Sequence, residues 1–332
     1  MRKIAIDFDS ANTNIYKVGS GLVLSESTVC AVSSGEKYRL KAIGEDAKKL
    51  IGKTSENTKI VFPVFEGEIV SVKVASGLLE GFLKKIDSYN KFERIEAVFG
   101  VPCGATSDMI EKYERVASNV GINKVYFVEA PLLSALGQHA PVSDYSPCFV
   151  IDMAGGTTNV GALTMSGIIA GVSVNFGSNK ISTDIIDYIA DNYGMQIGLL
   201  SAERLKREIG SLSENDGLCA TVNGRDVEKG TPRSLSLKAF ELFEPVKAYF
   251  DKVCEIANSV LIKLPPEVSA EIRRNGIFAS GVACMIFGAE KYLSKKLGMK
   301  VTVADNPDKI VALGGGIAIS DKNLLKKIAL DY

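Results

Sequence analysis

Two stretches of the sequence share one pattern, and this duplication constrains the fold more than any other feature. The first is IAIDFDSANTNIYKV, near the start of the chain, and the second is CFVIDMAGGTTNVGALT, near its middle. Each has an apolar run that ends in aspartate, a turn of small residues, and a Thr-Asn pair before a second apolar run. The matched positions share one offset, since 152 − 7, 158 − 13 and 159 − 14 each give 145. The pattern predicts a strand, a turn and a second strand in each copy.

Turns of this composition favour anions. Successive backbone N–H groups in a Gly/Ser/Thr turn point into one concavity, where they attract an anion such as phosphate. The aspartate at the end of each strand would then face the Mg²⁺ that accompanies a nucleotide, since Mg²⁺ prefers one or two carboxylates and keeps several waters. One such copy is more often an ordinary hairpin. Two copies half a chain apart predict two similar lobes that face each other across a cleft.

Length and charge limit the class of protein. The chain has 332 residues, more than one hydrophobic core usually supports, so two lobes of roughly 150 residues each are expected. Its 39 basic side chains balance its 39 acidic ones. A chain without net charge has no field that recruits nucleic acid non-specifically, so we expect no nucleic-acid partner.

The spacing of the cysteines and the single histidine exclude further kinds of site. The six cysteines include no CxxC pair and have mostly apolar neighbours, which predicts reduced core thiols in a cytoplasmic protein. His139 is the only histidine, so His-based metal sites and Ser-His or Cys-His triads are excluded. No stretch approaches the roughly 20 apolar residues of a membrane span.

Expected strands and helices alternate in both halves of the chain, which indicates α/β architecture. Apolar residues fall at helical spacing over 72–86, and 95–101 reads as a buried strand. The segment 39–61 is irregular and charged with one helical piece, so we expect a small insertion there. The segment 221–236 predicts a two-stranded ribbon around Asn223-Gly224.

Several motifs in a fixed order resemble a known family. They are IDFDSANTNIY, FVEAP, IDMAGGTTNV, SAERLKREIG, LPPE, and FASG followed later by VALGGG. Together they resemble the actin-like ATPases, and above all the MreB family of bacterial actin homologues. The resemblance extends over nearly the whole chain. It implies an α/β, actin-like (ribonuclease H-like) fold of two duplicated lobes with a nucleotide cleft between them. It also implies bound ATP and Mg²⁺, self-association into filaments, and a cytoskeletal role in cell shape.

The resemblance also implies domain boundaries. Domain I would comprise residues 1–143 and 317–332, with a small insertion at about 33–62. Domain II would comprise residues 144–316, with an insertion at about 181–240.

Site residues follow by position from the same resemblance. Asp7 and Asp152 match the metal-facing aspartates, and Gly281 matches the turn beside the adenosine. Glu203 and Lys206 match a pair beside the ribose and base, although from spacing alone they could equally form a surface i,i+3 ion pair. The full set implied to bind the nucleotide is Ser10, Ala11, Asn12, Thr13, Gly155, Gly156, Thr157, Thr158, Glu203, Lys206 and Gly281.

The largest departure from the family pattern lies in its Glu-Glu-Pro motif, which here reads Glu129-Ala130-Pro131. The glutamate before the proline is expected to position the attacking water, and alanine replaces it. Glu129 and Thr157 are the catalytic candidates that are left. One residue along a helix rotates a side chain by about 100°, so Glu129 should not replace the lost group. Because such groups are typically worth about 10²–10⁴-fold in rate, we expect slow or absent ATP hydrolysis.

Further departures lie in the phosphate loops. Asp9 stands where the family has glycine, and an added carboxylate beside a polyphosphate repels it unless a metal intervenes. Ala154 replaces the first of three glycines in the second loop, and Asn159 replaces a glutamate. These changes predict weak nucleotide binding or an altered preference.

Two other functions share this fold. A small-molecule kinase needs a catalytic aspartate in the cleft, and Asp9 is the only unusual carboxylate placed for that task. A non-polymerising nucleotide-binding scaffold of the actin/heat-shock chaperone fold is the second alternative.

Membrane contact is a separate expectation. MreB-type proteins commonly touch the membrane through an N-terminal amphipathic helix or an apolar loop in the first lobe. This sequence starts at the first expected strand, so the loop with Tyr89 and Phe92 is the place for a weak contact. A solvated loop is the alternative, since two aromatic residues make a marginal anchor. We expect a cytoplasmic protein, and this loop is where it would associate with the membrane if it does so.

Overall fold

The computed structural model describes the chain except for residues 1, 35–38, 87–93, 143–144, 214–215 and 332. Its first half forms a five-stranded sheet in the order β10-β9-β1-β2-β3. Strand β1 pairs antiparallel with β2 and parallel with β9. The strands are β1 (Arg2–Phe8), β2 (Asn12–Lys17), β3 (Gly21–Ser27), β9 (Ile95–Val101) and β10 (Lys124–Glu129).

The second half repeats this arrangement. Its sheet has the order β13-β12-β11-β17-β18, in which β11 pairs antiparallel with β12 and parallel with β17. The strands are β11 (Cys148–Met153), β12 (Thr158–Thr164), β13 (Gly167–Val174), β17 (Ile277–Ser280) and β18 (Val301–Val303). The expected duplicated two-lobe α/β fold is therefore confirmed, with the two matched hairpins at the centre of the two sheets.

Alternation along the central strands explains how each sheet is covered. In β1, Ile4, Ile6 and Phe8 belong to the core of the first lobe, whereas Ala5 belongs to a core shared by both sheets. Strand β11 alternates in the same way, with Phe149 and Ile151 in the core of the second lobe. The outer helices are α2 (Val72–Ile86) and α3 (Ser107–Asn119) in the first lobe, and α5 (Asn179–Tyr193), α7 (Phe243–Leu261) and α9 (Ala289–Leu297) in the second.

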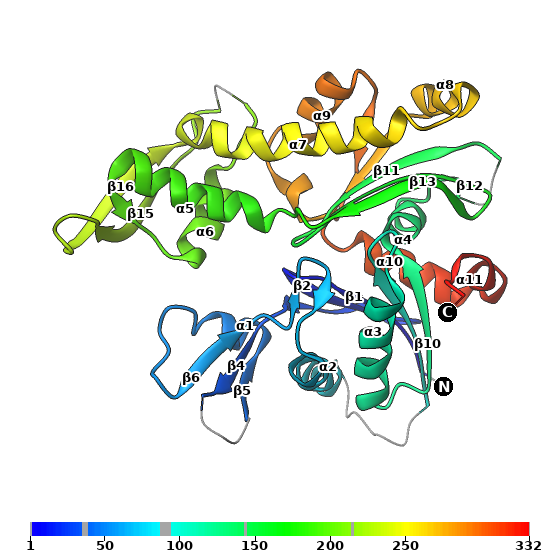
Figure 1. Ribbon diagram of the computed structural model, residues 1–332, viewed down its shortest axis with the longest axis horizontal. Helices are drawn as coiled ribbons and strands as arrows, with labels where there is room; N and C mark the ends of the chain where they lie inside the picture. The colour runs from blue at the N-terminus through cyan, green and yellow to red at the C-terminus, as the bar shows by residue number, and fades with distance from the viewer. Residues whose placement is uncertain (1, 35–38, 87–93, 143–144, 214–215, 332) are drawn as a thin grey trace.

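Two helices lie between the lobes. They are α4 (Ala130–Gly137) and α10 (Ile310–Ser320), and Figure 1 shows them between the upper and lower sheets. Their backbones touch, because a Cβ added at Gly314 would overlap Leu133 O and lie 2.9 Å from Gly137 N. Helix α11 (Lys322–Ile328) follows, and both termini lie on the side of the first lobe (Figure 1).

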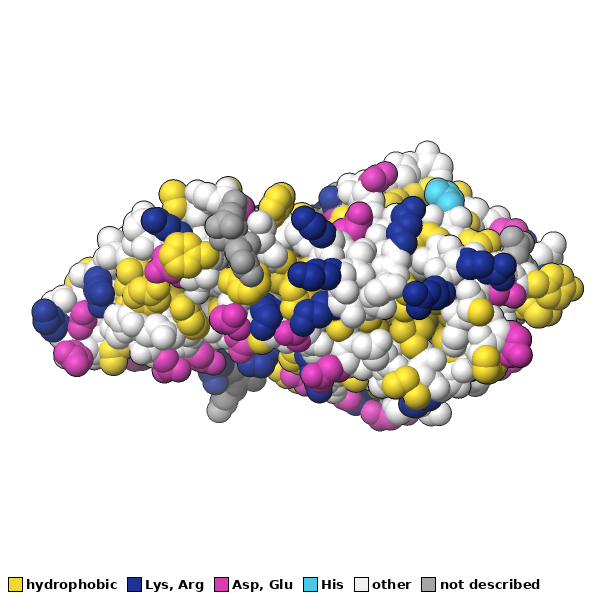
Figure 2. Space-filling model, turned by 90° about the horizontal axis from the view of Figure 1, so that it is seen from above, with side chains coloured by type: hydrophobic (Ala, Val, Ile, Leu, Met, Phe, Trp, Pro, Cys, Tyr) yellow, Lys and Arg dark blue, Asp and Glu magenta, His cyan; other side chains and the backbone are white. Residues whose placement is uncertain are grey.

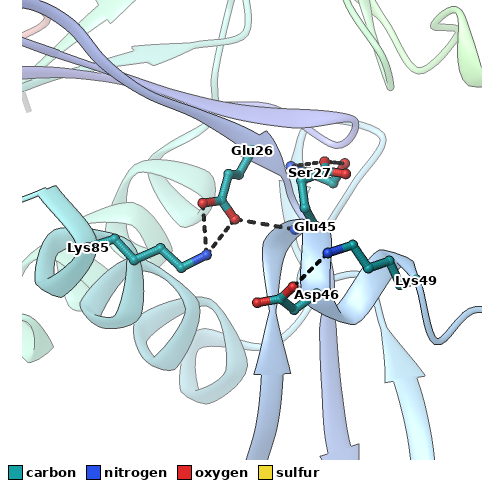
Figure 3. A network of polar contacts seen from close by, with 6 residues as sticks. All are labelled: Glu26, Ser27, Glu45, Asp46, Lys49 and Lys85. Atoms are coloured by element: carbon teal, nitrogen blue, oxygen red, sulfur yellow. Dashed lines mark hydrogen bonds and ion pairs between the residues drawn. The ribbon is translucent and has the colours of Figure 1, made fainter.

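The insertion of the first lobe is more regular than the sequence predicted. Strands β4 (Cys30–Ser33), β5 (Leu40–Ile43) and β6 (Thr58–Val61) form a sheet beside the short helix α1 (Gly44–Lys48). A polar network fastens α1 to the lobe (Figure 3). In it Lys85 Nζ lies 2.7 Å from Glu26 Oε2, and Ser27 Oγ donates to Glu45 Oε1 at 2.6 Å. Strands β5 and β6 were not predicted, because each has only four residues and one of them is a lysine.

The insertion of the second lobe contains the expected ribbon, but its turn was predicted at the wrong place. Strands β14 (Met195–Gln196), β15 (Cys219–Asp226) and β16 (Pro232–Lys238) form one sheet, next to α6 (Leu199–Ile209). Asn223 and Gly224 pair with β16 inside β15, so the turn follows Asp226. Gly224 serves close packing instead, because a Cβ there would overlap Gln196 O. Both insertions project to the same side (Figure 1).

The remaining elements complete the lobes. They are β7 (Val64–Phe65), β8 (Glu68–Ile69), α8 (Pro266–Asn275) and the 3₁₀ turns Ala239–Leu242 and Val282–Met285. All six cysteines are free, but Cys219 is exposed, so the prediction of core thiols holds for the other five. In the described part of the chain, no helix combines the length and apolarity that crossing a membrane requires.

Candidate functional site

Two adjoining hollows lie where the matched hairpins face each other. The first has about 350 Å³ of empty space including open solvent, and the second about 330 Å³. The first is lined by Asp7, Asp9, Asn12, Asn14, Asp152, Ala154, Gly281, Val282, Pro307, Asp308 and Val311. The second is lined by Asp7, Phe8, Asp9, Gly67, Gly100, Val101, Pro102, Tyr113, Ala130, Asp152, Ala154, Thr157 and Asn159.

The two strand-end aspartates, Asp7 and Asp152, line both hollows, and each accepts a hydrogen bond from an asparagine of its own hairpin. Asn14 Nδ2 donates to Asp7 Oδ2 at 3.1 Å, and Asn159 Nδ2 donates to Asp152 Oδ2 at 3.2 Å. These residues are also directly opposite in their hairpins. The duplication seen in the sequence therefore extends to side-chain contacts.

The carboxyl groups in this cleft are difficult to ionise together. Burial, followed by the charges of Asp9, Asp152 and Asp308, raises the pKa of Asp7 well above its usual range. Burial also raises the pKa of Asp152 to about 6, although hydrogen bonds from Ser280 and Asn159 oppose the rise. A cation between these groups would favour their charged forms.

The residues fit a hydrated Mg²⁺ better than a fully protein-bound ion. Within the described residues, no three His, Cys, Asp or Glu side chains gather as a direct metal cage. Mg²⁺ usually keeps several waters and takes one or two carboxylates, which Asp7 and Asp152 supply. The buried Asn14 Oδ1 has no hydrogen-bond partner among the described residues, and so offers one more oxygen to a bound water.

Asp9 reaches from the first loop to the second. Its Oδ2 accepts hydrogen bonds from Gly155 N at 2.8 Å and from Ala11 N at 3.2 Å, and its Oδ1 accepts one from Gly156 N at 3.5 Å. The loops are closely packed, because a Cβ on Gly155 would lie 2.8 Å from Ala11 N. Glycine is therefore required in the second loop for this contact.

Other predicted binding residues also lie at the cleft. Asn12 and Gly281 line the first hollow, and Thr157 lines the second. Gly281 has φ +90°, and a Cβ there would lie 2.6 Å from Met153 N, so only glycine suits this turn. Ser10 is buried at the loop contact, where its Oγ accepts from Gly67 N at 3.4 Å.

Thr13 and Thr158 were predicted to bind the nucleotide, but their side chains do not line the hollows between the hairpins. Thr13 Oγ1 lies 2.9 Å from Thr28 Oγ1, and Thr158 Oγ1 donates to Phe176 O at 2.6 Å. Both threonines are buried and neither lines a hollow among the described residues. The reason is strand alternation, which turns the neighbouring Asn14 and Asn159 toward the cleft instead.

Glu129 was predicted as a catalytic candidate, but its position does not suit that role. Its Oε1 accepts a hydrogen bond from Gly104 N at 2.6 Å, whereas the next residue, Ala130, lines the second hollow. The cleft therefore presents a methyl group at the end of β10 in place of a carboxylate. The other catalytic candidate, Thr157, lies in the same hollow, and its Oγ1 accepts from Asn159 Nδ2 at 3.3 Å.

Glu203 and Lys206 lie on α6 in the insertion of the second lobe, and in the described structure each has a partner other than its neighbour. Glu203 Oε2 lies 2.9 Å from Lys48 Nζ, which belongs to α1 of the opposite lobe. Lys206 Nζ donates to Ser178 O at 3.1 Å. The expected surface ion pair between Glu203 and Lys206 is therefore replaced by a contact of each residue with another partner. The contact of these two residues with the ribose and base stays a prediction.

The chain matches one protein family over nearly its whole length. A family model described as MreB/Mbl protein matches residues 1–327. The chain belongs to the MreB/Mbl family. It is 33% identical to the cell shape-determining protein MreB of Escherichia coli (strain K12), over 95% of this chain and 92% of the relative.

Solved structures agree with membership in the MreB/Mbl family. The structure of MreB 5 of Spiroplasma citri bound to AMPPNP has a TM-score of 0.92 and 27% identity, and the match covers 98% of this chain and 97% of that one. The MamK double helical filament has a TM-score of 0.80 at 17% identity, covering 96% and 99%, which shows the shared fold alone. The chain is thus an MreB-like, cell shape-determining actin homologue, as its motifs implied.

Within this MreB/Mbl cleft, the sequence interpretation missed Asn14, Asp308 and the role of Asn159. A signal for the two asparagines was available, because each follows a polar loop residue by two positions and so shares its face of the strand. Asp308 had no such signal, since it reaches the first hollow only through the packing of α10.

Lys206 gives a prediction about pH. Burial lowers its pKa from the usual 10.5 to about 8, an effect that Glu203 opposes and Lys48 reinforces. Between these two values the unfolded chain holds more protons on this lysine than the folded one, so stability rises with pH there. We expect the free energy of unfolding to gain about 2 kcal/mol from this group between pH 8 and 10.5, allowing for partial exposure.

Urea unfolding at pH 8, 9 and 10 tests this expectation. Lys206→Met should remove most of the rise, whereas Lys252→Met, at an exposed position, should keep it. Equal slopes for the wild type and Lys206→Met would contradict the assignment.

Proposed function

We propose that this chain binds a Mg²⁺–adenine nucleotide in the cleft between its lobes and assembles into cytoplasmic filaments that contribute to cell shape. The observation that carries the proposal is the convergence of Asp7 with Asn14, and of Asp152 with Asn159, on the same pair of hollows. The Spiroplasma citri relative bound to AMPPNP supports it.

The roles of the residues follow from their positions. Asp7 and Asp152 would hold the hydrated metal ion, which offsets the charge of the polyphosphate when bound. Gly281 would border the adenosine, while Ser10, Ala11 and Asn12 of the first loop and Gly155, Gly156 and Thr157 of the second would surround the phosphates. Because Ala130 offers no acceptor to an attacking water, hydrolysis would be slow or absent.

We retain the two-domain division with one change. Helix α10 packs on α4 and β1, and the carbonyl of its first residue, Ile310, lies against Gly137. We therefore propose that domain I resumes near residue 309 instead of 317. The insertions stay proposed at about 33–62 and 181–240. The small sheet of the first lobe starts slightly earlier, at Cys30, and that of the second lobe lies within 195–238.

Calorimetry with Mg-ATP and Mg-ADP tests the nucleotide proposal. We expect saturable binding that requires Mg²⁺ and that weakens at least tenfold in Asp152→Asn, because an ion ligand is lost. Asp108→Asn removes the same charge from an exposed position on α3 and should leave the affinity unchanged. Lack of binding by the wild type at millimolar nucleotide would refute the proposal.

Exposed hydrophobic side chains in the second lobe lead to a separate prediction about filament formation. Figure 2 shows basic and acidic side chains intermixed, with hydrophobic side chains at several places on the surface. Met285 and Phe287, each 59% exposed, follow the Gly281 turn in the second lobe. If they lie in a contact between copies, Phe287→Ser should raise the critical concentration for pelleting about tenfold.

Val227→Ser provides the control, because Val227 is equally exposed but lies beyond β15 in the insertion. Pelleting and electron microscopy with and without nucleotide give the readout. Unchanged assembly of Phe287→Ser would remove this surface from the interface, and absence of filaments in the wild type would favour the non-polymerising scaffold.

No observation favours the kinase alternative. Its only available base was Asp9, and that carboxylate is occupied by the amides of the second loop. The proposed membrane contact through Tyr89 and Phe92 lies outside the described residues.

A further inference from the structure

Asp9 occupies the place where the second loop would hold an anion. Its two carboxylate oxygens take the N–H groups of Gly155 and Gly156, which are the donors expected for a phosphate. The Ala11 N–H, from the first loop, donates to the same carboxylate. One side chain therefore satisfies donors from both phosphate loops.

The Asp9 side chain separates the amides of Gly155 and Gly156 from the hollows. Among the described lining residues, Asp9 borders both hollows, whereas neither Gly155 nor Gly156 borders either of them. A phosphate that enters the cleft would meet a carboxylate before it reached the loop amides. Because Asp9 is part of the chain, its effective concentration at these amides is far higher than that of free nucleotide.

The order of residues along the cleft indicates which phosphate is affected. The first hollow contains Gly281 and Val282 at the proposed adenosine side, and the second contains Ala130 and Thr157 at the proposed site of water attack. Asp9 lies at the boundary between the two hollows. A short phosphate chain can remain in the first hollow, but a longer one must extend past Asp9.

We infer that Asp9 is a tethered competitor for the terminal phosphate, and that it makes the cleft select nucleoside diphosphates over triphosphates. The inference rests on the proposed function, since it assigns a specificity-determining residue to that site. Triphosphate binds only when the Asp9 side chain leaves the Gly155 and Gly156 amides.

The experiment compares Mg-ADP with Mg-AMPPNP, a triphosphate analogue that resists hydrolysis. Dissociation constants are measured by calorimetry for the wild type, Asp9→Gly, Asp9→Asn and the surface control Asp108→Asn. We expect the wild type to bind ADP more tightly. Asp9→Gly should strengthen AMPPNP binding about tenfold or more, because charge-assisted bonds no longer compete, while ADP binding changes less than about threefold. Asp9→Asn keeps the size of the side chain but removes its charge, so its affinity for AMPPNP should lie between those of the wild type and Asp9→Gly.

The outcomes separate the inference from the proposed function. Binding of both nucleotides with an unchanged AMPPNP-to-ADP ratio in Asp9→Gly and Asp9→Asn would overturn the inference alone. Weaker binding of both nucleotides in these variants would also overturn it, because Asp9 would then act as a metal ligand. Absence of binding in every protein would overturn the proposed function and the inference together.

Discussion

Replacing Ala130 with glutamate should raise the rate of ATP hydrolysis about 10²–10⁴-fold. Ala130 begins α4 at the end of β10, and its methyl group lines the second hollow beside Thr157 and Asn159. A carboxylate there would be able to accept a hydrogen bond from a water on the side of the terminal phosphate. Phosphate release under saturating Mg-ATP measures the change.

The neighbouring glutamate provides the matched control. Glu129→Gln alters the carboxylate one residue earlier, which already accepts the Gly104 N–H outside the hollow, and should change hydrolysis less than about twofold. Calorimetry must show that Ala130→Glu still binds Mg-ATP. With binding retained, an unaltered rate in Ala130→Glu would contradict the view that a missing carboxylate limits turnover.

Gly314→Ala should destabilise the protein by about 3 kcal/mol or more, the upper part of the range for overpacked cores. In an exposed helix the same change would stabilise by about 1 kcal/mol, because alanine is the better helix former. Here the added methyl overlaps Leu133 O and lies 2.7 Å from Leu133 C. Backbone cannot rotate away as a side chain can, so α10 must move off α4 and the core shared by the lobes must open.

Urea unfolding of the nucleotide-free protein measures this loss. Gly198→Ala is the control, since a Cβ at this N-cap residue, just before α6, meets nothing within 4 Å in the described structure. It should change stability by less than about 1 kcal/mol, the scale of an N-cap substitution. Similar midpoints for both variants would show that the close contact of α4 with α10 tolerates a methyl group.

Local patterns explain why much of the fold could be predicted. Helix α2 and strand β9 have the predicted bounds, because each buries a continuous apolar face at the spacing of its element. The matched hairpins were predicted from an offset that needs no knowledge of contacts. Predictions from single turn residues were less secure. Asn223-Gly224 is typical of a hairpin turn, yet Gly224 is required where β14 approaches β15.

In the candidate site, too, some residues were predicted correctly from local patterns and others were not. Asp7 and Asp152 were identified correctly as cleft residues because they end buried strands. The threonines were assigned to the wrong face, although the period of a strand would have distinguished Thr13 from Asn14. The contact between Lys48 and Glu203 had no sequence signal, since it joins insertions from different lobes.

The order of residues alone was enough to predict two equivalent hairpins with paired aspartates and asparagines, and to show that no carboxylate stands at position 130. Such features are local, because they depend on the order of residues and the period of a strand. Three long-range contacts became visible only in the folded chain. Asp9 accepts hydrogen bonds from amides of the opposite loop, Glu129 accepts one from Gly104, and Gly314 lies against Leu133. Those contacts join residues far apart in the chain, and their partners are fixed by how the two sheets close around the shared core.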